Sequence, residues 1–145
     1  MWENFKSMPM VLKFLTFHAL MCFSLFLVAI IPRDYFVLDG RHVSYGEWWS
    51  SGVGPLIAAV GLAMAMAGVL FLAKRSFGRL IYLATFGGSL TVPFLLSRDF
   101  LPAAIGAVAA AAMWAYLFRN PAVRAYFTSN NSFKPKPLRS GKGMA

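Results

Sequence analysis

The sequence contains a single cysteine, Cys22, and only five acidic residues. One cysteine excludes a disulfide framework, a Cys-x-x-Cys redox pair and a cluster of thiolate metal ligands. No acidic residue lies inside a long apolar run, which argues against a proton-coupled carrier that relies on an intramembrane carboxylate. The sequence also lacks a glycine-rich phosphate loop, a nucleophile elbow and a His-Glu-x-x-His motif. We therefore expect no cofactor and no metal, and we favour a non-enzymatic role.

Charged residues are scarce as well. They make up 13% of the 145 residues, against 59% for hydrophobic ones, whereas soluble domains are about a quarter charged. This balance indicates that the lipid bilayer is the main partner of the chain. The formal net charge of +9 does not indicate nucleic-acid binding, because the basic residues lie between and after the apolar runs and do not gather on one face.

Four apolar runs predict an all-α integral membrane protein, built as a bundle of four transmembrane helices. They cover about residues 11–31, 54–73, 80–96 and 100–118, and helices of roughly 17–25 residues cross the hydrocarbon core. No small-x-small cleavage site follows the first run, so we expect an uncleaved signal anchor. Residues 1–127 then form the membrane domain, with an outer loop at 32–53, and residues 128–145 form a disordered cytoplasmic tail.

Lysine and arginine are distributed unevenly about the four runs. The outer side receives only Arg33, Arg41 and Arg98, whereas the other eleven of the fourteen fall on the side that carries both chain ends. Cytoplasmic loops of membrane proteins carry the excess of basic residues. We therefore predict a bacterial inner-membrane protein with both termini in the cytoplasm and with loop 32–53 outside.

The outer loop has predicted local structure. Asp39-Gly40 suits the positive φ angles of a two-residue hairpin turn, with Leu38 opposite Arg41. Ser44-x-x-Glu47 matches a capping box that would begin a short helix. The favoured interpretation is a structural cap with its aromatic rings in the headgroup layer, and the alternative is a surface that binds a partner or ligand. The candidate recognition residues are Asp39, Arg41, His42, Glu47, Trp48 and Trp49.

The second run carries small residues at alternating spacings of four and three. Such a row lets a neighbouring helix backbone approach closely, and a second row at Ala59, Ala63 and Ala67 marks another face. We therefore expect this helix to pack on two sides at the centre of the bundle, although glycine and alanine are also common in membrane helices without a packing role. The predicted helix-packing residues are Gly54, Ala58, Gly61, Ala65 and Gly68.

The third run is the least regular. Pro93 removes one helical hydrogen bond and crowds the preceding turn, so we expect a kink. The hydroxyls of Thr85 and Ser89 are placed to satisfy the disturbed backbone. The alternative is a broken helix that lines a binding cavity, as in transporters. After the third run, Asp99 is placed to cap the fourth helix, and the apolar residues of 121–127 predict a short surface helix.

His18 lies within the first run, with Cys22 one helical turn further on. An ionisable residue at membrane depth is a candidate functional site because burying it is costly. Two candidate ligands do not make a metal site. The favoured interpretation is a neutral histidine that is hydrogen-bonded to a neighbouring helix.

These observations favour an accessory or interaction protein of the membrane, acting with a membrane-protein partner or as a homo-oligomer through its small-residue faces. The alternative is a minimal transporter or channel that uses His18, the kinked third helix, and Thr85 or Ser89. A distant third is an enzyme at the outer surface, with Asp39, His42 and Glu47 as its polar groups. A transporter is expected to contain a polar cavity at membrane depth, and an accessory protein is expected to be packed there.

Overall fold

The computed structural model describes residues 1–33 and 36–128. Apart from Thr128, the predicted disordered tail lies outside the described residues. The helices and strands follow one another in the order α1 (Trp2–Lys6), α2 (Met10–Met21), α3 (Phe23–Ile30), β1 (Phe36–Leu38), β2 (Arg41–Val43), α4 (Tyr45–Ser50), α5 (Val53–Leu72), α6 (Phe77–Leu96), α7 (Phe100–Arg119) and α8 (Pro121–Thr128).

Four stretches of the described chain are helical, long and apolar enough to cross a membrane. They are Met10–Ile30, which combines α2 and α3, and the helices α5, α6 and α7. The predicted fold class, a largely helical protein with four membrane-spanning helices, is confirmed at this level. The observed boundaries of the second and fourth spans, Val53–Leu72 and Phe100–Arg119, lie within one residue of the predicted boundaries, 54–73 and 100–118.

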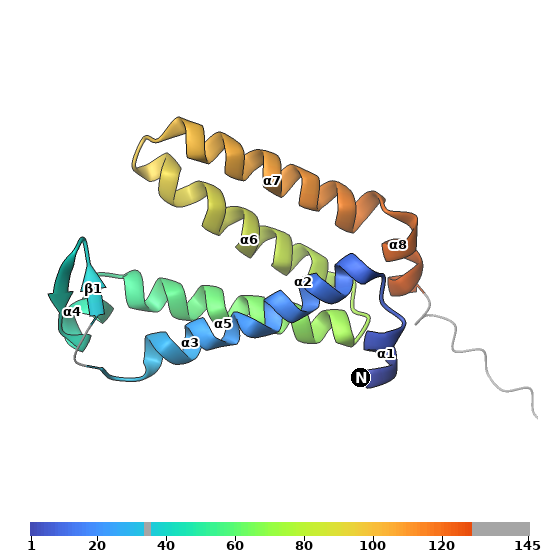
Figure 1. The fold of residues 1–145 in the computed structure, drawn as a ribbon, viewed down its shortest axis with the longest axis horizontal. Helices are drawn as coiled ribbons and strands as arrows, with labels where there is room; N and C mark the ends of the chain where they lie inside the picture. Colours follow the sequence, from blue (N-terminus) through green and yellow to red (C-terminus); the bar gives the residue numbers. More distant parts are fainter. Residues whose placement is uncertain (34–35, 129–145) are drawn as a thin grey trace, which may run out of the picture.

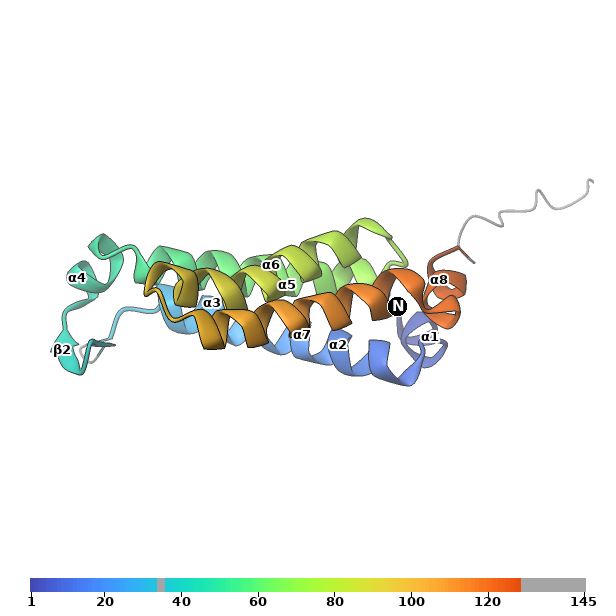
Figure 2. The same ribbon diagram turned by 90° about the horizontal axis from the view of Figure 1, so that it is seen from above.

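α5 is the central helix of the bundle. It packs against α2, α3 and α6, whereas α7 packs against α6 and α8. Figure 1 shows the α6–α7 hairpin meeting the other helices at the end that carries α1 and α8, and diverging from α5 toward the α6–α7 connection. Viewed from above, the hairpin lies over the layer formed by α2, α3 and α5 (Figure 2).

The first span is interrupted, whereas the sequence predicts one continuous helix over 11–31. α2 ends at Met21 and α3 begins at Phe23, with Cys22 between them. The Leu25 amide donates to the Cys22 carbonyl, three residues back, at 3.0 Å. The Ser24 hydroxyl donates to the Met21 carbonyl at 2.8 Å. Because such side-chain bonds compete with helical ones and bend helices, they account for the interruption.

The third span is longer than predicted. α6 begins at Phe77 and contains 20 residues, whereas the sequence predicts a span from about residue 80. Arg79 is accommodated in the first turn because its guanidinium reaches the far end of α7. There its Nη1 atom donates to the Leu117 carbonyl at 3.2 Å, and its charge lies 5.0 Å from the centre of the Phe118 ring and 4.8 Å from that of Phe127.

α8 covers the end of the bundle next to α1. The Asn120 side chain caps it, accepting from the Ala122 amide at 2.9 Å, and Val123, Tyr126 and Phe127 are buried. The Tyr126 hydroxyl donates to a backbone carbonyl of α5 at 3.0 Å. Burial raises the pKa of Tyr126 to about 12, so this hydroxyl remains a donor at neutral pH. The predicted surface helix is therefore held by packing against the protein's own helices.

The loop between the first two spans forms a small folded unit. β1 and β2 pair antiparallel in the register predicted by the turn, with Leu38 opposite Arg41. The two turn residues have φ angles of 50° and 78°, as an Asp-Gly turn allows. A second core, separate from that of the helices, is formed here by Phe36, Val43 and Trp48.

Candidate functional site

The intramembrane histidine is hydrogen-bonded to another span. The His18 Nδ1 atom lies 3.0 Å from the hydroxyl oxygen of Tyr82 on α6, and its Nε2 atom lies 3.8 Å from the Cys22 sulfur. The Phe86 ring meets the imidazole edge to face, with centres 6.1 Å apart. This is the arrangement favoured from the sequence, a histidine tied to a neighbouring helix. The described side chains include no group of three His, Cys, Asp or Glu that could hold a metal ion.

Thr85 and Ser89, the other members of the predicted intramembrane polar site, are not joined to His18. Neither makes a hydrogen bond to it within the described chain, and the Ser89 hydroxyl donates to the Phe86 carbonyl of its own helix at 2.9 Å. The Thr91 hydroxyl does the same with the Gly87 carbonyl at 2.7 Å. Neither hydroxyl bonds to the Ser89 carbonyl, which lies four residues before Pro93, and the helix continues through that proline to Leu96.

The row of small residues on α5 is packed within the chain, with Gly54 against Trp48 of α4 and Gly61 and Gly68 against the first span. All five members, Gly54, Ala58, Gly61, Ala65 and Gly68, are buried. A Cβ atom on Gly61 would lie 2.5 Å from the Phe26 nitrogen and 2.8 Å from the Cys22 oxygen. The backbones of α3 and α5 are therefore in direct contact, as small residues permit. This face is occupied within the chain and offers no room for a second protein.

The members of the second row of small residues on α5, Ala59, Ala63 and Ala67, differ in their surroundings. Ala67 is buried, whereas Ala59 and Ala63 line an apolar groove of about 720 Å³ between α5 and the first span. A smaller hollow of about 280 Å³ lies between α1, α2 and the end of α5. Apolar side chains line both hollows. The larger one is also lined by Leu20, Phe23, Leu62, Ala65, Met66 and Val69. The smaller one is lined by Met1, Trp2, Phe5, Phe17, Leu20 and Leu72.

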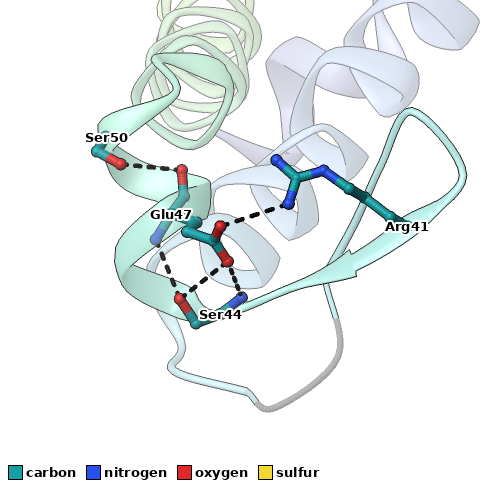
Figure 3. Close-up of polar contacts among 4 residues, drawn as sticks. All are labelled: Arg41, Ser44, Glu47 and Ser50. Atoms are coloured by element: carbon teal, nitrogen blue, oxygen red, sulfur yellow. Dashed lines mark hydrogen bonds and ion pairs between the residues drawn. The ribbon is translucent and has the colours of Figure 1, made fainter.

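The polar residues of the loop between the first two spans bond mainly to one another (Figure 3). The capping box is complete: the Glu47 amide donates to the Ser44 hydroxyl oxygen at 3.3 Å, and the Glu47 carboxylate accepts from the Ser44 amide at 3.1 Å. Arg41 donates to the same carboxylate at 3.4 Å. The hydrogen bond from the Ser44 amide, aided by the Arg41 charge, lowers the pKa of Glu47. Two predicted recognition residues are therefore engaged in holding α4 to the hairpin.

The other four predicted recognition residues divide into two pairs. Asp39 and His42 are exposed, and neither makes a side-chain hydrogen bond to another described residue. Trp48 is buried against the Phe36 ring, with ring centres 4.8 Å apart, and Trp49 is partly buried beside it. Neither indole N–H has an acceptor in the described part of the chain. The two exposed side chains remain the candidates for recognition.

Several residues that organise these sites were not singled out from the sequence, among them Tyr82, the partner of His18. Tyr45 was predicted only as the start of the short helix and as a ring in the headgroup layer, and its hydroxyl donates to the Ile30 carbonyl at 3.0 Å, tying α4 to the end of α3. Asn4 ties α1 to the Leu72 carbonyl at 2.9 Å. The only sequence signal for Tyr82 is a hydroxyl-bearing ring inside an apolar run, where such a group needs a partner.

Comparison of this chain with protein-family models, curated proteins and solved structures gave no match.

Proposed function

We propose that this chain is a non-enzymatic accessory or interaction protein of the membrane, and that it works by associating with another membrane protein or with a second copy of itself. The observation that supports this proposal is the α6–α7 hairpin. It diverges from α5 over its distal half (Figure 1), and α6 has the smallest buried share of the four spans, 11% against 33% for α5.

The two halves of α6 have different neighbours. In the first half, a Cβ atom on Gly78 would meet Leu70 of α5 at 2.8 Å, and Tyr82 is buried against Phe71. In the second half, the close contacts are with α7, where a Cβ atom on Gly106 would meet the Leu90 carbonyl oxygen. The distal hairpin is therefore held by its own two helices and presents its outer faces to the membrane.

Those faces carry small residues. On α6, Ala84 is exposed and a Cβ atom on Gly88 would meet no atom within 4 Å. On α7, Ala104, Ala107 and Ala111 are exposed at spacings of three and four. Helix association in membranes depends on close packing at small residues. Unoccupied small residues of this protein thus lie on the hairpin, whereas the Gly61 and Gly68 positions of α5 are filled by the first span.

A variant series tests the association. Gly88→Ile and Ala107→Ile place bulk on the two hairpin faces, and Ile105→Leu is a matched exposed control on α7. We expect the native protein and the control to give the same cross-linked species in membranes, either a homo-oligomer or one defined heteromer, and both isoleucine variants to lose it. A chain that stays monomeric and uncross-linked, or a species insensitive to both substitutions, contradicts the proposal.

The alternative function, a minimal transporter or channel, is supported by His18, an ionisable residue at membrane depth. Transport by this site predicts that His18→Leu abolishes the flux of an ion or small solute into vesicles while the protein still folds. The apolar lining of both grooves supports the accessory role, because a polar solute needs polar groups along its path.

We also propose that the protein lies in a bacterial inner membrane with both termini in the cytoplasm. The bundle end that carries α1 and α8 also carries the excess of lysine and arginine, which favours this orientation. Reporter fusions provide the test. A cytoplasm-dependent reporter is expected to be active after residue 145 and inactive when inserted at the Asp39-Gly40 turn. The reverse pattern overturns the orientation.

A further inference from the structure

An apolar groove runs along the seam between the first span and α5. The larger hollow extends from Phe23 and Ala59 to Val69, and the smaller one continues past Leu72 to α1. The two share Leu20 as a wall. Together the two hollows reach from the middle of α5 to the end of the bundle where α1 lies.

Three basic residues are close in sequence to residues at the α1 end of this groove, and the Lys6 Nζ atom lies 5.7 Å from the centre of the Trp2 ring, which lines that end. Lys6 directly follows Phe5, one of the lining residues, and Lys13 lies one helical turn before Phe17, another lining residue, on the same side of α2. Arg75 follows the end of α5, three residues after Leu72. The acid of α1, Glu3, lies 3.3 Å from Lys6.

We propose that this groove is a binding site for an anionic membrane phospholipid. An acyl chain lies along the seam, against Ala59 and Ala63, and the phosphate group lies at the α1 end near Lys6, Lys13 and Arg75. Basic pockets at the ends of membrane helices bind acidic headgroups, and each basic residue near the surface contributes to the attraction. The Trp2 ring, exposed and stacked with Phe5 at 5.9 Å, suits the headgroup layer.

A phospholipid fits this groove better than a protein helix does. The larger hollow alone, about 720 Å³, lies in the size range of sites for small ligands. An apolar channel that opens at one end onto positive charge matches an amphiphile with one anionic group. A partner helix would have to place an acidic residue at that end while leaving the rest of the seam apolar.

The test is a lipid titration of the purified full chain in mild detergent, followed by native mass spectrometry. The probes are dioleoyl-phosphatidylglycerol, which is anionic, and dioleoyl-phosphatidylcholine, which has the same chains and no net charge. We expect one phosphatidylglycerol to bind preferentially. Replacement of Lys6, Lys13 and Arg75 by glutamine is expected to weaken its binding by about tenfold to a hundredfold, to the level of phosphatidylcholine. The matched control replaces Arg33, Arg41 and Arg98 by glutamine, at the opposite end of the bundle, and is expected to leave binding unchanged.

A second pair of variants tests the apolar part. Ala63→Trp and the smaller Ala59→Leu fill the groove and are expected to reduce binding of both lipids, in the order Trp more than Leu, with circular dichroism verifying the fold. Equal binding of the two lipids by the native chain overturns the proposal, as does unchanged binding in folded Ala59→Leu and Ala63→Trp proteins. Efficient disulfide formation between two copies of a Leu62→Cys variant lacking Cys22 also overturns it, because a second copy would then cover the groove.

Discussion

The His18 imidazole and the Tyr82 hydroxyl meet at 3.0 Å, and this hydrogen bond joins the first span to the third. The bond involves side chains separated by 64 positions in the chain. Because Tyr82 is buried, the bond removes the cost of burying its hydroxyl without a partner.

The first prediction concerns this bond. Tyr82→Phe retains the ring that stacks on Phe86 at 5.7 Å and removes only the hydroxyl. Hydrogen bonds between membrane helices contribute about 0.6 kcal/mol on average and at most about 1.7, so we expect a loss of unfolding free energy in that range. The measurement is unfolding in mixed detergent micelles, combined with His18→Leu in a double-mutant cycle. Strictly additive losses from the two substitutions would show that the bond contributes nothing.

The second prediction compares two glycines. Gly61→Ala introduces a methyl group against the α3 backbone, 2.5 Å from the Phe26 nitrogen, and is expected to destabilise the protein by forcing α3 and α5 apart. Gly88→Ala is the matched control, because its new methyl group meets no atom within 4 Å. There the gain in helix propensity, up to about 1 kcal/mol, is expected to dominate. Thermal unfolding in detergent would distinguish the two, and equal effects would contradict the close approach.

The third prediction concerns the capping box of α4. Ser44→Ala and Glu47→Ala each remove one half of it, and losing an N-cap costs about 0.5–2 kcal/mol of helix stability. Trp48 and Trp49 lie on this helix, so we expect a red shift and a broadening of tryptophan fluorescence. Ser50→Ala is the control on the same helix, since its hydroxyl bonds only to the Glu47 carbonyl at 3.2 Å.

The pH dependence of α4 follows from the lowered pKa of Glu47. A carboxyl group whose pKa is lower in the folded state stabilises that state at pH values above its unfolded pKa. This contribution is lost as the pH falls through the lower, folded pKa. We therefore expect the α4 fluorescence signal to change on acidification below about pH 4.5, the ordinary value for glutamate, and Glu47→Gln to remove that transition. An identical acid transition in the variant would assign it to another group.

The fourth prediction concerns Arg79, whose guanidinium lies between the Phe118 and Phe127 rings. Each cation–π contact contributes about 0.5–2 kcal/mol when partly desolvated, and lysine cannot reproduce the planar stacking. We expect Arg79→Lys to increase amide hydrogen exchange across Pro121–Thr128. Arg124→Ala, which removes an exposed charge from α8 itself, is expected to leave exchange there unchanged. Protection that is unaltered in Arg79→Lys would mean that apolar packing alone holds α8.

Much of this architecture follows from local sequence patterns. Long apolar runs predict the spans because only helices satisfy backbone groups in lipid. The turn at Asp39-Gly40 and the capping box at Ser44 and Glu47 were predicted because each depends on residues close together in the chain. Local patterns also fail: Asp99 precedes α7 but its side chain makes no capping hydrogen bond to that helix. Its carboxylate accepts from the Ser97 hydroxyl at 3.2 Å instead.

For the candidate site too, some features follow from local sequence patterns and others depend on the tertiary structure. The sequence by itself determined that His18 lies within the first apolar span, that α5 carries two rows of small residues and that the loop folds as a hairpin followed by a helix. Only the tertiary structure decided that Tyr82 is the partner of His18, that Gly61 and Gly68 of α5 pack against the first span, and that Ala59 and Ala63 line an apolar groove. The physical reason is that hydrophobic periodicity fixes which residues enter the membrane, whereas helices in lipid choose their neighbours by close packing and hydrogen bonding between distant positions.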